Sequence, residues 1–468
     1  MCLFSSNHTT LVRTLLKVAD MHKVLILGAG MVVKPIVTYL LNNKIKVTVA
    51  TRTRSKAEAM IGNHPNGKAI AWTADNEAGL DKMVADNDLT VSLLPWANHP
   101  LVARYCLRHK KNMVTTSYVK PEMQALDKQA REAGIMILNE LGLDPGIDHM
   151  SAMRIIDNVH GKNGKIEGFY SICGALPAKG ADDNPFKYKF SWSPKGVIMA
   201  GNNSGRFLRN GKIVTVPTEE LFKNPLKVDF PGTGILEVYP NRDSLPYIEL
   251  YGIPETQTMV RGTFRHPGWC EIMHAMKRLR LISDEKKDFT GKTYSEMTAM
   301  MAGVDNSSDI KDKVASRLNI KPDSLPVNAM EWLGLFDDRS MNRGTDSVFE
   351  VVSDLMIDKM MLGEEETDMV AMQHIFLASW PNGKKEVIKS TMLDYGTPAT
   401  GTSVARTVAL PAAIGVEMIL NNKIKAKGVH IPVIPEIYNP VLNRLGEMGI
   451  SMSEEFGLPE SEFITPAS

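Results

Sequence analysis

Cysteine is scarce in this chain, and the few that occur are not arranged to bind a metal or to build a disulfide framework. Cys2, Cys106, Cys173 and Cys270 lie far apart, and none belongs to a CxxC or CxxH pattern. Structural zinc sites and disulfide-rich secreted folds both need closely spaced, repeated cysteines. The pattern predicts no metal site and favours a reducing, cytoplasmic setting.

Long apolar runs and an excess of one charge are also missing. No uninterrupted apolar stretch reaches the roughly 20 residues that a membrane-spanning helix needs. The 54 basic and 53 acidic residues leave a formal net charge of +1, which argues against a nucleic-acid-binding surface. We therefore expect a small-molecule substrate as the partner, and neither a membrane nor a nucleic acid.

The length predicts more than one domain. The chain has 468 residues, of which 43% are hydrophobic and 23% charged, as in an ordinary globular protein. Residues 1–20 carry Arg13 and Lys17 and no acid before Asp20, but they lack the arginine-rich amphipathic pattern of a transit peptide. We interpret them as a disordered extension or the product of an upstream start codon, because Met21 directly precedes the first strand.

The first third of the chain alternates short apolar runs with amphipathic helical segments. Strands are predicted at residues 23–27, 45–50, 69–72, 90–94, 112–115 and 135–139, with helices between them. This rhythm predicts α/β architecture: a doubly wound parallel sheet, or Rossmann fold, over residues 21–145.

The alternation ends near residue 146, where a second domain is expected. Strands are predicted at 166–173, 249–251, 367–376 and 385–393, the last two joined through the hairpin signal Asn382-Gly383. We predict a mixed α/β substrate domain over 146–289 and 339–399. Its small helical insertion is expected at 290–338, where Pro322 and Pro326 interrupt the pattern, and a helix at 404–420 returns to the first domain and completes it over about 400–450.

The first strand ends in a glycine pair that is typical of dinucleotide binding. The segment GAGMV follows a strand and opens a helix, so its backbone can approach a pyrophosphate at the helix N-terminus. The third position of the fingerprint is Val33 rather than Gly or Ala, and a glycine pair alone is often an ordinary turn. Within a β-α-β unit it predicts a nucleotide site. The residues expected at the pyrophosphate are Gly28, Gly30, Met31 and Val32.

The end of the second strand favours NADP over NAD. It carries Arg52, Thr53 and Arg54 and no acid, whereas an NAD site usually places a carboxylate there for the ribose 2′-hydroxyl. Arg52 suits a 2′-phosphate, and Thr53 adds a hydroxyl donor. The alternative is that Arg52 and Arg54 only solvate a loop.

Several motifs together resemble one enzyme family. TTSY (115–118), ELGLDPGIDHM (140–150), GALPAKGADDNPFKYKFSWSP (174–194), YPNRDS (239–244) and RGTFR (261–265) occur in the order and form seen in saccharopine reductases, the glutamate-forming saccharopine dehydrogenases. The resemblance runs from residue 21 to about residue 449. It implies that saccharopine, water and NADP⁺ give L-glutamate, 2-aminoadipate 6-semialdehyde and NADPH reversibly through an imine, as part of lysine metabolism. It also implies a homodimer that forms through the second domain.

The resemblance also implies a set of site residues in loops at the carboxyl ends of the strands and between the domains. Arg242 and Arg265 suit bidentate capture of the substrate's carboxylates, although Arg242 could instead pair with neighbouring Asp243. The substrate pocket is expected to contain Ser117, Tyr118, Arg242, Thr263, Phe264 and Arg265. Further cofactor contacts are expected at Ser92, Leu93, Leu143, Asp144 and Pro145.

Imine chemistry needs a proton donor and an acceptor near the reacting carbon. The resemblance points to Tyr118, Asp144 and Cys173. Three alternatives stay open: Asp144 holds the Pro-Gly turn, Cys173 is a small buried residue, and His149 is the base.

Two other functions compete with this interpretation. A carboxynorspermidine dehydrogenase reduces a similar imine, but its substrate has fewer carboxylates, which the pair Arg242 and Arg265 argues against. A non-catalytic Rossmann binding protein would leave a cleft with Tyr118, Asp144 and both arginines without a purpose.

Overall fold

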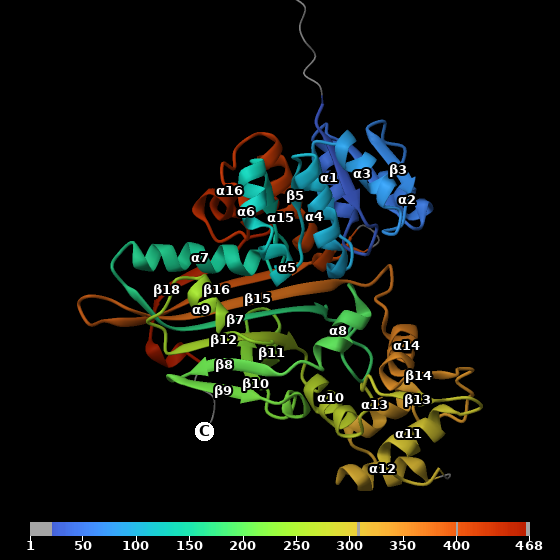
Figure 1. The fold of residues 1–468 in the computed structure, drawn as a ribbon. Helices are drawn as coiled ribbons and strands as arrows, with labels where there is room; N and C mark the ends of the chain where they lie inside the picture. The colour runs from blue at the N-terminus through green and yellow to red at the C-terminus, as the bar shows by residue number, and fades with distance from the viewer. Residues whose placement is uncertain (1–20, 307–308, 399–400, 465–468) are drawn as a thin grey trace, which may run out of the picture.

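The computed structural model describes residues 21–306, 309–398 and 401–464, and the extension expected at residues 1–20 lies outside them. One lobe holds a parallel sheet and the other a mixed sheet with a group of helices beside it (Figure 1). Helix α7 (Ile147–His160) lies between the two lobes. The predicted class, a Rossmann sheet with a second mixed α/β domain, is confirmed.

Within the described residues the first lobe contains a seven-stranded parallel sheet in the order β17-β6-β5-β4-β1-β2-β3. The order reverses between β1 and β4, which is where a doubly wound sheet opens a crevice for a ligand. The strands are β1 (Lys23–Leu27), β2 (Lys46–Thr51), β3 (Gly67–Ala71), β4 (Leu89–Ser92), β5 (Asn112–Val114), β6 (Met136–Leu138) and β17 (Gly428–His430). The helices between them are α1 (Lys34–Asn42), α2 (Arg54–Ile61), α3 (Glu77–Asp86), α4 (His99–Arg108), α5 (Pro121–Gln124) and α6 (Asp127–Ala133).

The C-terminal part of the chain returns to this lobe. The predicted helix at 404–420 is α15 (Ser403–Leu420), which packs on α1 and is followed by β17 and α16 (Pro435–Glu447). Of the helices in the described part of the chain, α15 is long and apolar enough to cross a membrane by length and composition, but 78% of it is buried inside the protein. Its apolarity is accounted for by this core position.

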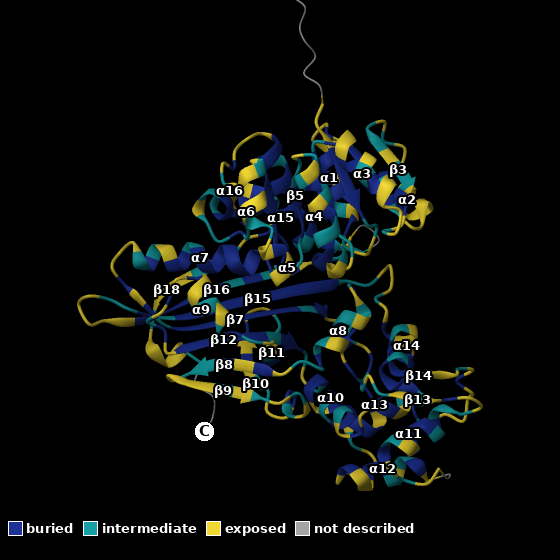
Figure 2. Ribbon diagram, viewed as in Figure 1, coloured by how far each residue is buried: buried dark blue, intermediate teal, exposed yellow. Residues whose placement is uncertain are grey.

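The second lobe is built on a mixed sheet in the order β10-β11-β12-β7-β15-β16-β18, with β8 attached to β12 and β9 attached to β8. The predicted hairpin through Asn382-Gly383 is observed between β15 and β16. β7 and β15 are buried along most of their length (Figure 2) because both faces of the sheet are covered. The strands are β7 (Lys165–Pro177), β8 (Gly205–Arg209), β9 (Lys212–Val216), β10 (Leu226–Phe230), β11 (Gly234–Pro240), β12 (Thr258–Arg265), β15 (Asp368–Ser379), β16 (Lys385–Tyr395) and β18 (Ser453–Leu458).

The segment expected to be a helical insertion contains α11 (Tyr294–Ala302), α12 (Ile310–Leu318) and α13 (Leu325–Leu333). Pro326 lies in the first turn of α13, where a proline costs no hydrogen bond, so it marks a helix start. The neighbouring elements are α8 (Pro194–Ala200), α10 (Trp269–Arg278), β13 (Lys286–Asp288), β14 (Thr345–Ser347) and α14 (Val348–Met360).

The strand predicted at residues 249–251 is wrong. The segment forms α9 (Pro246–Leu250), with Pro246 in its first turn, where the fixed φ of proline suits a helix. Tyr247 and Tyr251 stand four residues apart, the spacing of one helical face, and both rings lie within 6 Å of the His149 ring. The helix therefore brings two tyrosines to the site described below.

A shared apolar core joins the two lobes. Phe169 of β7 and Phe376 of β15 stack with ring centroids 4.1 Å apart, and they belong to the same buried cluster as the Rossmann strands and α7. Burial of one such ring contributes about 1.5–3 kcal/mol. This core holds the carboxyl ends of the Rossmann strands against the second sheet.

Candidate active site

The glycine loop has the geometry of a dinucleotide site. A Cβ on Gly28, whose φ is 109°, would lie 2.7 Å from the carbonyl oxygen of Leu93, so only glycine fits where β1 and β4 come together. A Cβ on Gly30 would meet nothing within 4 Å, which leaves open space beside the loop. Among the described residues no side chain caps the N-terminus of α1, so its amides are available to a phosphate. A dinucleotide fits this loop.

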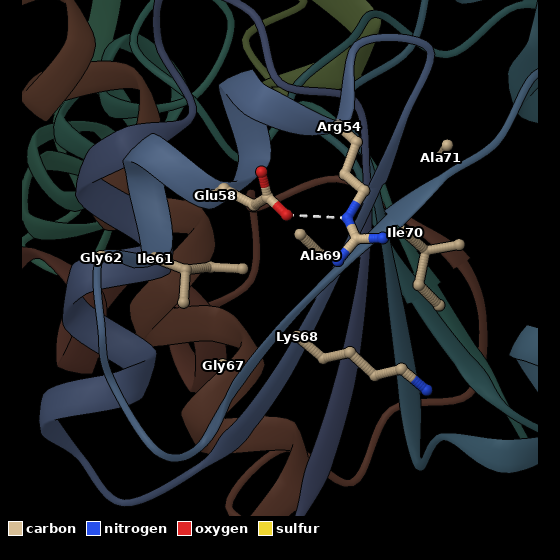
Figure 3. Close-up of a pocket in the computed structure, with 9 residues that line it drawn as sticks. All are labelled: Arg54, Glu58, Ile61, Gly62, Gly67, Lys68, Ala69, Ile70 and Ala71. Atoms are coloured by element: carbon tan, nitrogen blue, oxygen red, sulfur yellow. Dashed lines mark hydrogen bonds and ion pairs between the residues drawn. The ribbon is translucent and has the colours of Figure 1, made fainter.

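Arg52, the residue predicted to bind the 2′-phosphate, and its neighbour Arg54 have different surroundings. Arg54 pairs with Glu58 at 2.8 Å on the first turns of α2 and lines a shallow hollow of about 650 Å³ at the outer edge of the sheet (Figure 3). That hollow includes no residue of the glycine loop. Arg52 and Thr53 are exposed just after β2, and Arg52 makes no ion pair within the described chain. Arg52 is therefore the available cation.

A histidine that the sequence analysis missed links the cofactor loop to the substrate loop. His99 Nδ1 lies 2.8 Å from Ser92 Oγ, and its Nε2 lies 2.8 Å from Ser117 Oγ. Burial lowers the pKa of His99 to about 4, so the ring is neutral near pH 7. It ties the end of β4 to the loop after β5. No sequence motif marks this residue, because the link depends on two loops meeting in space.

Tyr118 and Asp144 belong to a polar cluster centred on Arg261. The Tyr118 hydroxyl donates to Asp144 Oδ1 at 2.8 Å. The Arg261 guanidinium donates to Asp144, to Asp148 Oδ2 at 3.2 Å, to the Tyr118 oxygen at 3.1 Å and to the Tyr247 oxygen at 2.7 Å. The side chains of Arg261 and Asp148 are only 3% and 1% exposed. The cluster thus holds one cation and two carboxylates at the junction of the lobes.

The cluster also affects the titration of its members. Burial by itself would lower the pKa of Arg261, but Asp144 and the other acidic groups outweigh it and hold that pKa above its ordinary value. Burial raises the pKa of the Tyr118 hydroxyl, against the opposing effect of Arg261. Arg261 is therefore a permanent cation, and Tyr118 is a neutral hydroxyl that can donate.

Arg261 was missed although its motif was recognised. In RGTFR the alternation of a strand places Arg261, Thr263 and Arg265 on one face. In the parallel register with β7, Ser171 lies opposite Arg261 and Cys173 lies opposite Thr263. Because side chains that are two residues apart along a strand share a face, the spacing of Arg261 from Thr263 was the signal that could have identified Arg261 as a site residue.

Arg265 occupies a different environment from the one expected. Its guanidinium lies 4.9 Å from the Tyr188 ring centroid, 5.6 Å from that of Tyr239 and 5.3 Å from that of Trp269, and it donates to the Phe264 carbonyl. The side chain is buried, and its Nε has no partner in the described residues. Ring faces hold this cation in place, and its contact with substrate stays a prediction.

The Phe264 ring is buried in the core of the second domain, and its predicted contact with the substrate stays a prediction. The ring points to the face of β12 opposite to Thr263 and packs against Phe230 with centroids 5.3 Å apart. The physical reason is again the alternation of side chains along a strand. Only the backbone of Phe264 remains available to a ligand, whereas the Thr263 side chain lies on the site face.

Arg242 is exposed beside the cluster. Its guanidinium lies 5.5 Å from the centroid of the Tyr118 ring. The residue lies in the loop after β11 and has a φ of 56°. Asp243 pairs with Arg206 at 3.1 Å, so the alternative ion pair between Arg242 and Asp243 is not found. Arg242 is free to receive a carboxylate.

The remaining proton candidates differ in what they can do. Burial raises the pKa of the Cys173 thiol well above its ordinary value, so Cys173 is neutral and is no base near pH 7. His149 is fully buried; its Nε2 donates to Glu140 at 2.8 Å and its Nδ1 lies 2.7 Å from the Tyr251 oxygen. Both ring nitrogens are occupied within the protein, which argues against His149 as the base.

Leu143 and Pro145 flank Asp144 in the buried turn before α7, and the Asp144–Pro145 peptide is cis. Asp144 Oδ1 accepts its bonds from Tyr118 and Arg261. The described contacts thus link Asp144 to the cluster rather than leave it only as a turn residue. Its contact with the cofactor, like those of Leu143 and Pro145, stays a prediction.

Fold and site together define a dinucleotide-linked oxidoreductase, with a Rossmann domain facing a substrate domain across a polar cluster. The particular family follows from the sequence comparisons. Residues 24–138 match the saccharopine dehydrogenase NADP binding domain, and residues 142–450 match the saccharopine dehydrogenase C-terminal domain. The chain belongs to the saccharopine dehydrogenase family, as the motifs predicted.

Individual relatives match more than nine-tenths of the length of this chain. The chain is 38% identical over 451 residues to saccharopine dehydrogenase [NADP(+), L-glutamate-forming] of Schizosaccharomyces pombe, covering 93% of this chain and 99% of that one. It is 37% identical to a bovine mitochondrial alpha-aminoadipic semialdehyde synthase, of which it covers 47%. The solved apo saccharopine dehydrogenase (L-Glu forming) of Saccharomyces cerevisiae is similar with a TM-score of 0.85 and 35% identity, over 93% of this chain and all of that chain.

Proposed function

We propose that the protein is an NADP-dependent, L-glutamate-forming saccharopine dehydrogenase. It oxidises the CH–NH group of saccharopine, and with water the products are L-glutamate, 2-aminoadipate 6-semialdehyde and NADPH, in a reversible step of lysine metabolism. The observation that carries the proposal is the polar cluster of Tyr118, Asp144, Asp148 and Arg261, in a chain that aligns over 93% of its length with an L-glutamate-forming enzyme. The match to an NADP binding domain confirms the predicted cofactor.

The charges of the cluster suit this substrate. With Asp144 and Asp148 ionised, two carboxylates face the single cation Arg261. The surplus negative charge favours the secondary amine of saccharopine, which is protonated near pH 7. Arg242, exposed at the edge of the cluster, offers a fork of donors to a substrate carboxylate. The substrate amine is therefore drawn toward Asp144 and Asp148, and the substrate carboxylates are held at the edge of the cluster.

The proton transfers follow from this arrangement. NADP⁺, when bound, accepts the hydride from the carbon next to the amine. Before that transfer, Asp144 takes the ammonium proton and leaves a neutral amine. Asp144 then releases that proton to solvent, so that as a carboxylate it can take a proton from the water that adds to the imine carbon. It passes this proton to the nitrogen, and the C–N bond breaks as the proton of the new hydroxyl group is transferred to the departing glutamate amine, while the Tyr118 hydroxyl donates a hydrogen bond. His99 holds Ser92 and Ser117 in register across the two loops.

A homodimer and a cytoplasmic location belong to the same proposal. Ile213 of β9 and Ile235 of β11 are 57% and 49% exposed on the second domain. Exposed apolar side chains of this size favour contact with another protein surface, here a second copy of the chain. Light scattering that gives the mass of two chains supports the dimer, and the mass of one chain opposes it.

The function is tested by absorbance at the reduced-nicotinamide band. Purified protein is mixed with saccharopine and either NADP⁺ or NAD⁺, and the reverse reaction is run with glutamate, the semialdehyde and NADPH. Fast reduction of NADP⁺ and slow reduction of NAD⁺ are expected. Silence in both directions rejects the proposal and leaves the polyamine-precursor enzyme or a non-catalytic binding protein, which carboxynorspermidine as substrate then separates.

Replacement of Arg52 by alanine is expected to raise the KM for NADP⁺ by about 10- to 100-fold, the usual weight of a charged, forked hydrogen bond. The KM for NAD⁺, which has no 2′-phosphate, should change by less than about 2-fold. Arg54→Ala is the matched control, because Arg54 is already paired with Glu58. A large effect at Arg54 and none at Arg52 would reverse the assignment.

A further inference from the structure

Glu140 holds the chain on both sides of Tyr118. Its backbone N–H donates to the carbonyl oxygen of Ser117 at 3.2 Å. Its carboxylate Oε1 accepts from the backbone N–H of Val119 at 2.8 Å. One residue thus fixes the two peptides that flank Tyr118, which itself makes its described hydrogen bonds only through its hydroxyl, to Asp144 and Arg261. The position of that hydroxyl depends on how this loop is held.

The backbone of Glu140 is unusual. Its φ is 57°, in the left-handed region that favours glycine, and the residue is only 6% exposed. A buried carboxylate is costly unless it is paired and hydrogen-bonded. Both conditions are met here through specific partners, so the side chain has a defined place rather than a solvated one.

The second carboxylate oxygen ties the loop to the helix between the lobes. Glu140 Oε2 accepts from Nε2 of His149 at 2.8 Å, and the other ring nitrogen lies 2.7 Å from the Tyr251 oxygen. Burial would lower the pKa of His149, but the carboxylates of Asp148 and Glu140 outweigh it and raise that pKa. His149 and Asp148 are neighbours on the first turn of α7, and Asp148 contacts Arg261. The Tyr118 loop and the Arg261 cluster are therefore anchored to the same helical turn.

We propose that Glu140, backed by His149, is a positioning residue that sets the Tyr118 hydroxyl against Asp144 and Arg261. It touches neither substrate nor cofactor in this role and acts through Tyr118. The kinetic part of the inference rests on the proposed function. Because a displacement of about 1 Å in a reacting group costs up to 100-fold in rate, loss of this anchor lowers turnover without removing any group that transfers a proton.

The test is a double-mutant cycle between Glu140 and Tyr118. Glu140→Ala is expected to lower kcat with saccharopine by about 10- to 100-fold and to leave the KM for NADP⁺ within about 2-fold. In a Tyr118→Phe background, which lacks the hydroxyl, the same change should cost less than about 3-fold. Glu140→Gln keeps an acceptor for the Val119 amide and should recover most of the rate. Equal losses in both backgrounds would show a merely structural role and overturn the proposal.

Two further variants keep the test interpretable. Glu140→Gly removes the carboxylate but suits the left-handed backbone, so it should fold where alanine strains the chain, and it should show the same kinetic loss. Asp127→Ala is the matched control: Asp127 also accepts from one backbone amide, that of Val429 at 2.8 Å, and from one cation, Arg131 at 2.9 Å. Its loss should leave kcat within about 2-fold, since it has no link to Tyr118.

Amide hydrogen exchange gives a readout that does not depend on activity. The peptide that contains the Val119 amide should exchange at least about 10-fold faster in Glu140→Gly and remain protected in Glu140→Gln. Unchanged exchange in Glu140→Gly would overturn the anchor whatever the kinetics. Faster exchange in a protein whose wild type does not oxidise saccharopine would keep the anchor and reject the proposed function.

Discussion

Replacing Arg261 by methionine is expected to cost about 3–5 kcal/mol of folding free energy and to remove measurable turnover of saccharopine. The guanidinium is 3% exposed and contacts Asp144 and Asp148 together with two tyrosine hydroxyls. Without it, two carboxylates are left in the interior with no cation between them, and a buried unpaired charge is among the most destabilising changes known in proteins. Urea unfolding followed by circular dichroism measures the first effect, and the NADPH assay measures the second.

The cause can be separated from simple loss of packing. Adding Asp148→Asn to the methionine variant removes one of the two stranded charges and should restore at least about 1 kcal/mol of stability without restoring activity. Arg343→Met is the surface control, because Arg343 also contacts two carboxylates, Asp346 and Asp354, but is 26% exposed. Its cost should stay below about 1 kcal/mol. A similar cost for Arg261 and Arg343 would contradict the role given to burial.

The Rossmann half of the fold could be predicted because its signals are local. Each strand is a short apolar run, each helix has one apolar face, and the glycine pair stands where the first strand turns into the first helix. The hairpin through Asn382-Gly383 was predictable for the same reason. Segment 249–251 was misassigned because three residues are too few to reveal a period, and the decisive signal, Pro246, stands before them.

The site was predicted less completely because it depends on contacts distant in sequence. Tyr118 and Asp144 were expected from their motifs, but Arg261, which contacts both, is more than 110 positions further along the chain. His99 and Glu140 act on loops that meet only after folding. For Arg265, the motif gave the residue but not its surroundings, since the rings that enclose it come from three separate segments.

The buried charges of the site alternate in sign. Glu140 contacts His149, His149 neighbours Asp148, Asp148 contacts Arg261, and Arg261 contacts Asp144. With His149 protonated, each charge has an opposite charge beside it, which is the condition under which ions are tolerated in an interior. The series begins and ends on a carboxylate, and the last one, Asp144, is the member that stays partly accessible, at 17% exposure. The excess negative charge is thus presented where the substrate amine must bind.

Asp144→Asn is expected to lower kcat by about 100- to 10,000-fold, the usual contribution of a general base. Asparagine keeps an oxygen that accepts from Arg261 and from the Tyr118 hydroxyl, so the fold and the cluster geometry should remain. What is lost is the ability to take the ammonium proton of saccharopine. Initial rates with saccharopine and NADP⁺ across pH 6–10 (roughly the range in which the substrate amine titrates) measure this, and the remaining rate should rise with pH as free amine becomes available.

Cys173→Ala is the matched control for Asp144, since Cys173 lies on β7 opposite Thr263 of β12 but carries a neutral thiol. Its loss should change kcat by less than about 10-fold, because an un-ionised thiol with a raised pKa is a weak acid and no base near pH 7. If the alanine variant loses more activity than Asp144→Asn, the thiol carries the proton and Asp144 is a structural partner of Arg261. The expected order, with Asp144 far more costly than Cys173, follows from which of the two groups is charged and accessible at the cluster.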